Sequence, residues 1–275
     1  MQKKNIIAKL PQPIQDLLPQ VQVNIPFTML YDTYLDRFIE YRLNPEIGID
    51  AEALERFELS DFQRIAEKLH ERHLSITLHG PFIDLAAGSI DPAVKAVTRN
   101  RFEQLLNLAA VFKPGAVVCH AGYDWKRYGF FKDEWIESSL DIWSWLADSL
   151  MTHDARLMLE NVYEDDPEDI GVILDRLKHQ NVGFCLDAGH LFAFGNGELK
   201  QWLAVLGSTI GQLHLHDNHG LKDEHLPLGA GRIDFNLLFD HLVSKDLPRP
   251  IITLEPHREE DLWPTLDYLA AVWPW

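Results

Sequence analysis

Short segments rich in aliphatic and β-branched residues alternate along this chain with longer amphipathic segments. Strands that alternate with helices form parallel sheets, because each crossover helix returns the chain to the same edge. The sequence has no glycine-rich turn of the kind that begins a dinucleotide-binding sheet. The pattern therefore predicts an α/β fold, a closed (β/α)8 TIM barrel. The eight expected strands are residues 21–25, 46–49, 75–79, 116–120, 156–160, 182–187, 210–214 and 250–255.

The length of 275 residues and the hydrophobic content of 46% suit a single barrel domain. We expect residues 1–20, which contain three prolines, to form a short N-terminal extension and residues 21–275 to form the catalytic barrel. Residues 5–10 offer an alternative first strand. Ser60 and Gln63 have the spacing of a capping box and predict a helix start. An apolar stripe over residues 133–151 predicts a helix packed on the core.

The two cysteines, Cys119 and Cys185, lie inside apolar strand-like segments, which favours buried core positions over a disulfide framework. No apolar run approaches the roughly 20 residues that a membrane helix needs. The residues after Lys3 and Lys4 lack the continuous apolar stretch of a secretory signal. We therefore expect a cytoplasmic protein that does not associate with membranes.

The chain carries 25 Lys and Arg residues against 42 Asp and Glu residues, a formal charge of −17. Such a surface repels polyanions, and no basic run longer than a pair is present. The composition disfavours nucleic acid as a partner and favours a small-molecule substrate. It leaves the oligomeric state open.

Ionisable residues occupy or directly follow the ends of six expected strands. In a barrel all strand C-termini open on one face, so these side chains converge there. Packed together, such groups would be desolvated and repel each other unless cations compensated them. The sequence therefore predicts a centre for divalent metal built from His79, His120, Glu160, Asp187, His214 and Glu255.

Three further candidate ligands lie in the loops beyond these strands: His190, Asp223 and His225. A set of imidazole nitrogens and carboxylate oxygens without thiolate suits Zn²⁺, Mn²⁺, Fe²⁺ or Co²⁺, and disfavours Ca²⁺, which takes oxygen ligands only. We expect Zn or Mn as the cofactor.

Seven motifs of this chain resemble those of the xylose-isomerase-like TIM barrel superfamily, from about Val21 to the C-terminus. That superfamily joins sugar and sugar-phosphate isomerases and epimerases with endonuclease IV, of AP endonuclease family 2. The motifs are Leu-His-Gly-Pro-Phe (78–82), Cys-His-Ala-Gly (119–122), Leu-Glu-Asn (159–161), Asp-Ala-Gly-His (187–190), His-Leu-His-Asp (214–217), Asp-Glu-His-Leu-Pro-Leu-Gly (223–229) and Leu-Glu-Pro (254–256).

The resemblance implies between one and three ions per chain. In the isomerase branch, one metal is held by Glu160, Asp187, His214 and Glu255, and the two glutamates also move protons. In the endonuclease IV branch, His79, His120 and Glu160 hold a first zinc, the same four residues a second, and His190, Asp223 and His225 a third. All nine positions carry a suitable residue here.

The chain departs from the family pattern at two places. Gly229, Ala230 and Gly231 stand where the family often has Gly-Glu-Gly, which removes one possible partner of a metal ligand or one substrate contact. His216 stands where endonuclease IV has an amide, so it either binds substrate or bonds to a carbonyl. Further substrate candidates are Phe82, Lys126 and His257, and Asn24, Glu46 and Asp50 are pocket candidates from position alone.

The leading functional hypothesis is a metal-dependent sugar or sugar-phosphate isomerase or epimerase, in which the paired catalytic residues Glu160 and Glu255 transfer a proton beside a metal-bound hydroxy-carbonyl. The alternative is a multi-zinc phosphoesterase resembling endonuclease IV, which acts on abasic DNA. A metal-binding barrel without catalysis is the third reading. The number of ions per chain separates the first two hypotheses.

Overall fold

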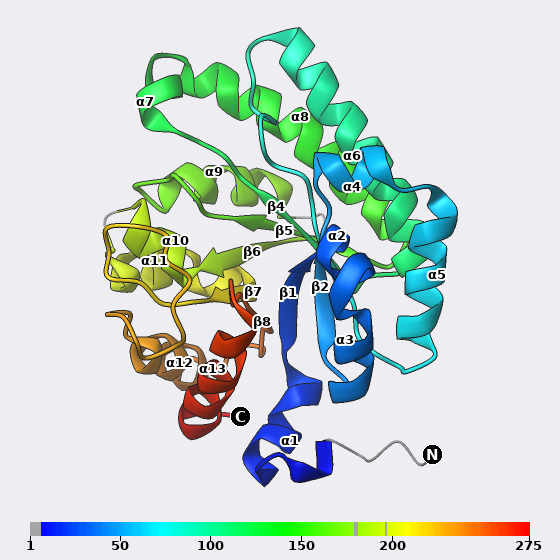
Figure 1. Ribbon diagram of the computed structural model, residues 1–275. Coiled ribbons are helices and arrows are strands. Elements are labelled where there is room, and N and C mark those ends of the chain that lie inside the picture. Colours follow the sequence, from blue (N-terminus) through cyan, green and yellow to red (C-terminus); the bar gives the residue numbers. More distant parts are fainter. Residues whose placement is uncertain (1–6, 179–180, 196) are drawn as a thin grey trace.

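The computed structural model describes residues 7–178, 181–195 and 197–275. Its strands pair in parallel and in chain order, and the last strand, β8 (Ile251–Leu254), pairs with the first, β1 (Gln22–Pro26). Figure 1 shows the strands in the centre of the molecule with helices around them. The predicted closed (β/α)8 TIM barrel is confirmed. The intervening strands are β2 (Asn44–Gly48), β3 (Thr77–His79), β4 (Ala116–His120), β5 (Arg156–Glu160), β6 (Val182–Asp187) and β7 (Ile210–Leu215).

Helices connect the strands and cover the outside of the barrel (Figure 1). Those before β5 are α1 (Gln12–Leu17), α2 (Phe27–Met29), α3 (Leu35–Tyr41), α4 (Ala51–Arg56), α5 (Leu59–His70), α6 (Pro92–Phe112), α7 (Trp125–Tyr128) and α8 (Lys132–Met151). Those after it are α9 (Glu168–Leu177), α10 (Ala188–Ala193), α11 (Leu199–Leu206), α12 (Phe235–Ser244) and α13 (Glu259–Val272). A π-helical turn over Leu30–Tyr34 joins α2 to α3, and single 3-10 turns cover Ile7–Lys9, Leu18–Gln20, Gly129–Phe131 and Gly207–Thr209. None of the described helices combines the length and apolar character needed to span a bilayer.

All eight predicted strands are present, with ends that differ by at most two residues from the expected bounds. The alternative strand at residues 5–10 is wrong where the structure describes it, because Ile7–Lys9 is a 3-10 turn, and residues 5 and 6 lie outside the described part. The extension continues into α1, which lies against α13 and buries Ile14 and Leu17 in the main core. The boundary at residue 20 stays a prediction.

The helix predictions succeed in one case and need correction in the other. The stripe over residues 133–151 is confirmed by α8, whose face of Trp and Leu side chains is buried. The proposed cap at Ser60 is wrong, since α5 already begins at Leu59. The Asp61 carboxylate accepts a hydrogen bond from the Glu58 backbone N–H at 3.2 Å, so the helix start is stabilised ahead of the place that Ser60 and Gln63 would give it.

Alternate residues of a strand face the barrel axis, and on β4 these include Ala116 and Val118. With Met158 and the free thiol of Cys185 they form a small apolar cluster that is separate from the main core. The main core lies between the strands and the helices and contains Cys119. Both cysteines are buried as predicted.

Nearer the C-terminal ends of the strands, the interior of the barrel becomes polar. Glu46 on β2 is completely buried, and its carboxylate accepts hydrogen bonds from Thr77, Gln212 and Thr253 on three other strands. This polar layer supports the ionisable residues at the strand ends.

Candidate metal centre

The strand ends bring together the six ionisable residues that the sequence singled out. His79, His120, Glu160 and Asp187 are the last residues of β3 to β6. His214 is the penultimate residue of β7, and Glu255 directly follows β8. Register fixes their neighbours, because His120 is paired with Glu160 and Asp187 with His214 across adjacent strands. The convergence that was expected at one face of the barrel is what the structure shows.

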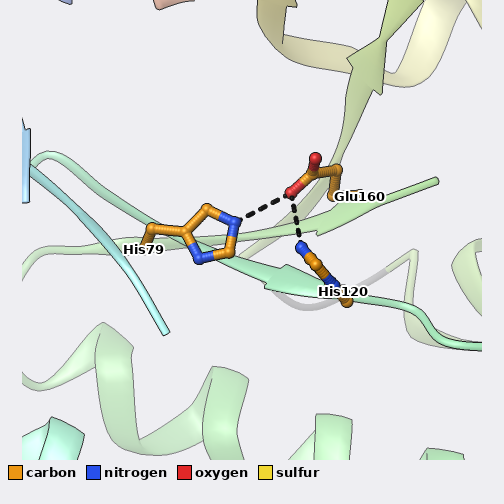
Figure 2. A group of neighbouring side chains, drawn as sticks. All are labelled: His79, His120 and Glu160. Carbon is orange, nitrogen blue, oxygen red and sulfur yellow. Dashed lines mark hydrogen bonds and ion pairs between the residues drawn. The ribbon is translucent and has the colours of Figure 1, made fainter. Parts of the chain in front are cut away.

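The first cluster joins the ends of β3, β4 and β5. Figure 2 shows His79 and His120 pointing at the Glu160 carboxylate, with Nε2 to Oε2 distances of 3.0 Å and 3.6 Å. Nδ1 of His79 lies 2.9 Å from the Gly80 carbonyl, which only accepts, so Nδ1 donates and Nε2 faces the carboxylate. Burial lowers the pKa of His120 to about 3, which favours the neutral imidazole that a metal requires.

The second cluster surrounds His214 at the barrel axis. Its Nδ1 lies 3.3 Å from Glu160 Oε1, 3.0 Å from Glu255 Oε1 and 3.9 Å from Asp187 Oδ2. Its Nε2 lies 2.9 Å from Glu46 Oε1. One side of the ring therefore faces three carboxylates, while Glu46 holds the other side. Such a carboxylate behind a ligating histidine fixes its ring and tautomer.

The third cluster combines His190 from α10 with Asp223 and His225 from the loop after β7. His225 Nε2 lies 3.1 Å and His190 Nε2 lies 3.5 Å from Asp223 Oδ2. Nδ1 of each ring faces a backbone carbonyl, of Asn161 at 3.1 Å for His190 and of Glu255 at 2.9 Å for His225. Both Nε2 atoms are thereby directed at the same carboxylate.

The pKa shifts of these groups show that the carboxylates and the imidazoles stabilise each other's charged forms. Burial by itself would raise the pKa of Glu160, but the charges and hydrogen bonds of His214, His120 and His190 lower it well below its usual value. Burial opposes a charged His225, yet the hydrogen bond to Asp223 and the nearby Glu255 raise its pKa to about 9. Positive charge is strongly favoured between these carboxylates.

Buried polar atoms that lack a hydrogen-bond partner indicate whether the residues fit a metal. Among the described residues, His216 Nδ1 and Asp223 Oδ1 are buried without a hydrogen-bond partner. A buried polar atom without a partner is costly, and a cation supplies the missing interaction. Groups of three ligand atoms lie close enough to share an ion, for example those of His79, His120 and Glu160. The donor set of imidazole and carboxylate groups fits divalent metal.

A cavity of about 680 Å³ opens above these clusters. Of the four expected substrate residues, Phe82 and His257 line it, whereas His216 is buried beneath and Lys126 does not contribute to its wall. Lys126 lies on α7, with its Nζ 5.9 Å from the centre of the Trp125 ring. The cavity wall also contains the exposed apolar side chains of Ile83, Val97, Tyr163 and Phe194. Arg101 is a basic residue of the lining.

Asp217 has a role that the sequence did not indicate. It is completely buried, and its carboxylate accepts hydrogen bonds from the backbone N–H groups of Asn218, Gly229, Gly231 and Ile233 at 2.9 to 3.2 Å. Its own backbone exchanges two hydrogen bonds with Leu226. Asp217 therefore shapes the loop that carries Asp223 and His225. The signal in the sequence is its place at the end of the motif His-Leu-His-Asp (214–217), which did not indicate this role.

Glu46 and Asp50 were expected near the pocket from position alone. Glu46 proves to lie below the cavity, where it holds His214, and Asn24 donates to it at 3.3 Å. Asp50 lines the cavity and caps α4 by accepting from the Ala53 N–H at 2.7 Å. The sequence located these residues but not the partners that define their roles.

Among proteins with related sequences is a probable endonuclease 4 of Mycobacterium leprae. It is 27% identical over 209 residues, which cover 72% of this chain and 80% of that protein. The chain spans between 60 and 80% of the length of the curated relatives it matches.

Two solved structures share the fold over nearly the whole chain. The TTHB071 protein from Thermus thermophilus, soaked with ZnCl₂, is 26% identical with a TM-score of 0.79, and the match covers 92% of this chain and 98% of that one. A D-tagatose 3-epimerase-like protein has 21% identity and a TM-score of 0.73, with coverage of 92% and 97%. The second likeness shows the fold alone.

The family comparison agrees with the barrel and with the motifs that carry the resemblance. The model of the xylose isomerase-like TIM barrel family matches residues 38–271, which include every residue of the three clusters. The chain therefore belongs to the xylose isomerase-like TIM barrel family.

Proposed function

We propose that this protein is a multinuclear metal-dependent phosphoester hydrolase that acts on a small molecule. The observation that carries the proposal is the environment of Glu160. Its Oε2 faces His79 and His120, and its Oε1 faces His190 and His214. Both oxygens are engaged by ligand-type residues on two sides, as expected of a carboxylate that bridges two ions.

Three sets of residues would hold the ions. The first is His79, His120 and Glu160, the second Glu160, Asp187, His214 and Glu255, and the third His190, Asp223 and His225. When bound, Zn²⁺ or Mn²⁺ would activate water near neutral pH and stabilise negative charge on the phosphoester oxygens.

The two glutamates would then have different roles. Glu160 also lines the cavity, but it is 1% exposed and both of its oxygens lie beside imidazoles, which favours a role as a ligand over a role in proton transfer. Glu255 lines the cavity, and the ion-pair partners of its Oε2 among the described residues are distant, His225 at 3.8 Å and His216 at 3.9 Å. Glu255 Oε2 is therefore the carboxylate oxygen that would accept a proton from the attacking water.

The walls of the cavity indicate the class of substrate. Exposed Phe82, Tyr163 and Phe194 offer flat apolar surfaces, and the one arginine of the lining, Arg101, is paired with Glu55 at 2.7 Å. The net charge of −17 opposes a long polyanion. A small phosphoester with a sugar or a ring fits these walls better than duplex DNA does. The relative named a probable endonuclease 4 supports phosphoester chemistry in this family.

The test combines metal analysis with hydrolysis. Protein purified without chelators should contain more than one ion per chain and should hydrolyse bis(p-nitrophenyl) phosphate or p-nitrophenyl phosphate. Glu255→Gln should keep the ions of the first and third sets and lower kcat by about 10²-fold or more, as loss of a proton acceptor does. A single ion together with no hydrolysis would overturn the proposal. Incision of an abasic duplex at low salt would move the substrate class to DNA.

A sugar isomerase or epimerase is the second candidate. One observation favours it: Glu160 and Glu255, from β5 and the end of β8, both approach His214 Nδ1, at 3.3 and 3.0 Å. Two carboxylates beside one ion suit removal and return of a proton next to a carbonyl. Such an enzyme would incorporate solvent deuterium into a ketose, which a panel of ketoses in D₂O would reveal by NMR. Full turnover by Glu255→Gln would contradict this assignment.

A further inference from the structure

The wall of the cavity outside the three metal clusters carries negative charge. Asp50 and Asp84 line the cavity and are exposed, and neither has an ion-pair partner among the described residues. Arg101 is the one Lys or Arg side chain of this lining, and Glu55 lies 2.7 Å from its guanidinium. The described lining therefore offers a substrate two carboxylates and no cation that lacks a partner.

The two aspartates belong to neighbouring loops, which follow β2 and β3. The Ile49 N–H donates to the His79 carbonyl at 2.9 Å and so joins the starts of these loops. Phe82, two residues before Asp84, stacks on the ring of His120 with centroids 4.2 Å apart. That contact ties the loop of Asp84 to the first cluster. Both carboxylates therefore belong to the side of the mouth that adjoins the first cluster.

Aromatic rings form the rest of the wall. Phe82 is 43% exposed on the side of the two aspartates. Tyr163 and Phe194, with ring centroids 5.4 Å apart, line the cavity from the side of β5 and β6, and β6 lies opposite β2 in the closed order of strands. Aromatic rings attract cations through their quadrupole. The rings and the carboxylates thus favour the same kind of group.

We propose that the cavity selects phosphoesters whose organic part is positively charged, such as the ester of an amino alcohol. The inference rests on the proposed function, because the metal clusters must hold the phosphoryl group. Beyond those clusters, Asp50 and Asp84 are the charges that an organic part meets on this wall. They attract a positive group and repel a second negative group. The formal charge of −17 acts in the same direction.

The experiment compares three phosphomonoesters of nearly equal size and different charge. They are 2-ammonioethyl phosphate, propyl phosphate and 2-carboxyethyl phosphate. Calorimetry measures their binding to metal-replete protein, and release of inorganic phosphate gives kcat/KM. At low salt the cationic ester should bind about tenfold more tightly than the neutral ester, and the anionic ester about tenfold more weakly.

Salt separates charge from hydrogen bonding. The two carboxylates can also accept hydrogen bonds from a neutral hydroxyl group, but that contact depends little on ionic strength. The attraction of a charge at an exposed wall is screened, so the preference for the cationic ester should shrink at about 0.5 M salt. A preference that does not weaken with salt overturns the proposal.

The variant that tests the wall is Asp50→Asn combined with Asp84→Asn. Asparagine can still cap α4 at position 50, where Asp50 accepts from the Ala53 N–H at 2.7 Å. Asparagine also tolerates the φ of 58° at position 84. The double variant should therefore fold like the wild type and bind the three esters with nearly equal affinity. Asp240→Asn, which removes an exposed carboxylate from α12, is the matched control and should keep the preference.

Each outcome bears on one claim. Equal binding of the three esters by the wild type, or a preference that survives in the double variant, overturns this proposal alone. A charge preference without hydrolysis of any ester overturns the proposed function alone. If none of the three esters binds to metal-replete protein, both are overturned.

Discussion

Backbone carbonyls select the nitrogen that each candidate ligand presents. His79, His190 and His225 direct Nδ1 at the carbonyls of Gly80, Asn161 and Glu255, so Nε2 faces a carboxylate in each case. Orienting contacts of this kind govern metal affinity nearly as much as the ligands themselves. His214 differs, because the buried carboxylate of Glu46 holds its Nε2 and leaves Nδ1 facing the other carboxylates of the second cluster.

Glu46→Gln should therefore lower the affinity of the central cluster for zinc by about 10- to 100-fold, because a neutral amide neither fixes the His214 tautomer nor increases its basicity. Competition with a chromophoric chelator measures the change. Glu52→Gln is the control, because the Glu52 side chain is 66% exposed on α4. An unchanged affinity in Glu46→Gln would show that Glu46 does not position His214.

Glu164 gives the stability a dependence on pH that is separate from the metal ligands. Burial raises its pKa to about 7, although the backbone N–H groups of Val162 and Tyr123 donate to its carboxylate and lower it. Below the unfolded value of 4.5 both states bind the proton, and between 4.5 and about 7 only the folded state does. The stabilisation is thus present at low pH and lost as the pH rises through about 7.

The free energy of unfolding of the wild type, relative to Glu164→Gln, should fall by up to about 3 kcal/mol between pH 4.5 and 8. Urea titrations of chelator-treated protein at the two pH values measure the difference. A difference that is constant or that grows with pH would contradict the buried, protonated state of Glu164.

At the scale of elements, the loop between β7 and α12 decides whether the third cluster exists. Strands place the other ligands by register, but Asp223 and His225 depend on the path of this loop. The Asp217 carboxylate holds the beginning and the end of this loop together by accepting four backbone hydrogen bonds. Gly229 adopts a φ of +81°, and a Cβ at Gly231 would overlap Asp217 Oδ1. Ala230 between them is exposed. The backbone hydrogen bonds to Asp217 therefore require the two glycines but do not require the glutamate that the family often has at position 230.

Asp217→Asn should destabilise the loop by about 1–3 kcal/mol, because an amide NH₂ would replace a carboxylate oxygen that accepts from buried N–H groups. Hydrogen exchange of residues 217–233 should quicken, and zinc affinity at the third cluster should fall. Asp240→Asn, at an exposed position on α12, is the control. Exchange rates equal to those of the wild type would contradict the role of Asp217.

At the scale of the whole molecule, the barrel has an apolar cluster deep in its interior and a charged layer at its C-terminal end. Glu46, Glu160 and Asp187 are at most 1% exposed. Among the described residues, their partners are imidazoles and neutral hydrogen-bond donors. We therefore expect metal binding, where it occurs at these clusters, to stabilise the fold.

Removal of metal should lower the melting temperature by about 10 °C. An ion at 100 to 1,000 times its Kd stabilises the folded state by about 3–4 kcal/mol, and 1 kcal/mol corresponds to about 2–4 °C in a chain of this size. Calorimetry with a chelator, followed by addition of zinc or manganese, measures the loss and the recovery. A melting temperature that does not respond to chelation would show that the clusters are stable without metal.

Much of this architecture follows from local patterns in the sequence. The alternation of apolar and amphipathic segments gives the barrel because strands buried on both faces are short and continuously apolar. The same segments locate His120, Glu160 and Asp187, since each ends a strand and strand ends converge in a closed parallel barrel. The start of α5 was misplaced because the capping contact between Glu58 and Asp61 competes with the one expected at Ser60.

The sequence by itself determined the barrel, the strand ends and the types of side chain gathered there, because strand periodicity and connectivity are local properties. Only the tertiary structure decided that His216 lies beneath the cavity, that Lys126 lies outside its wall, that Glu46 holds His214 and that Asp217 shapes the loop. These outcomes depend on contacts between residues distant in the chain and on the path of an irregular loop, which no local pattern specifies.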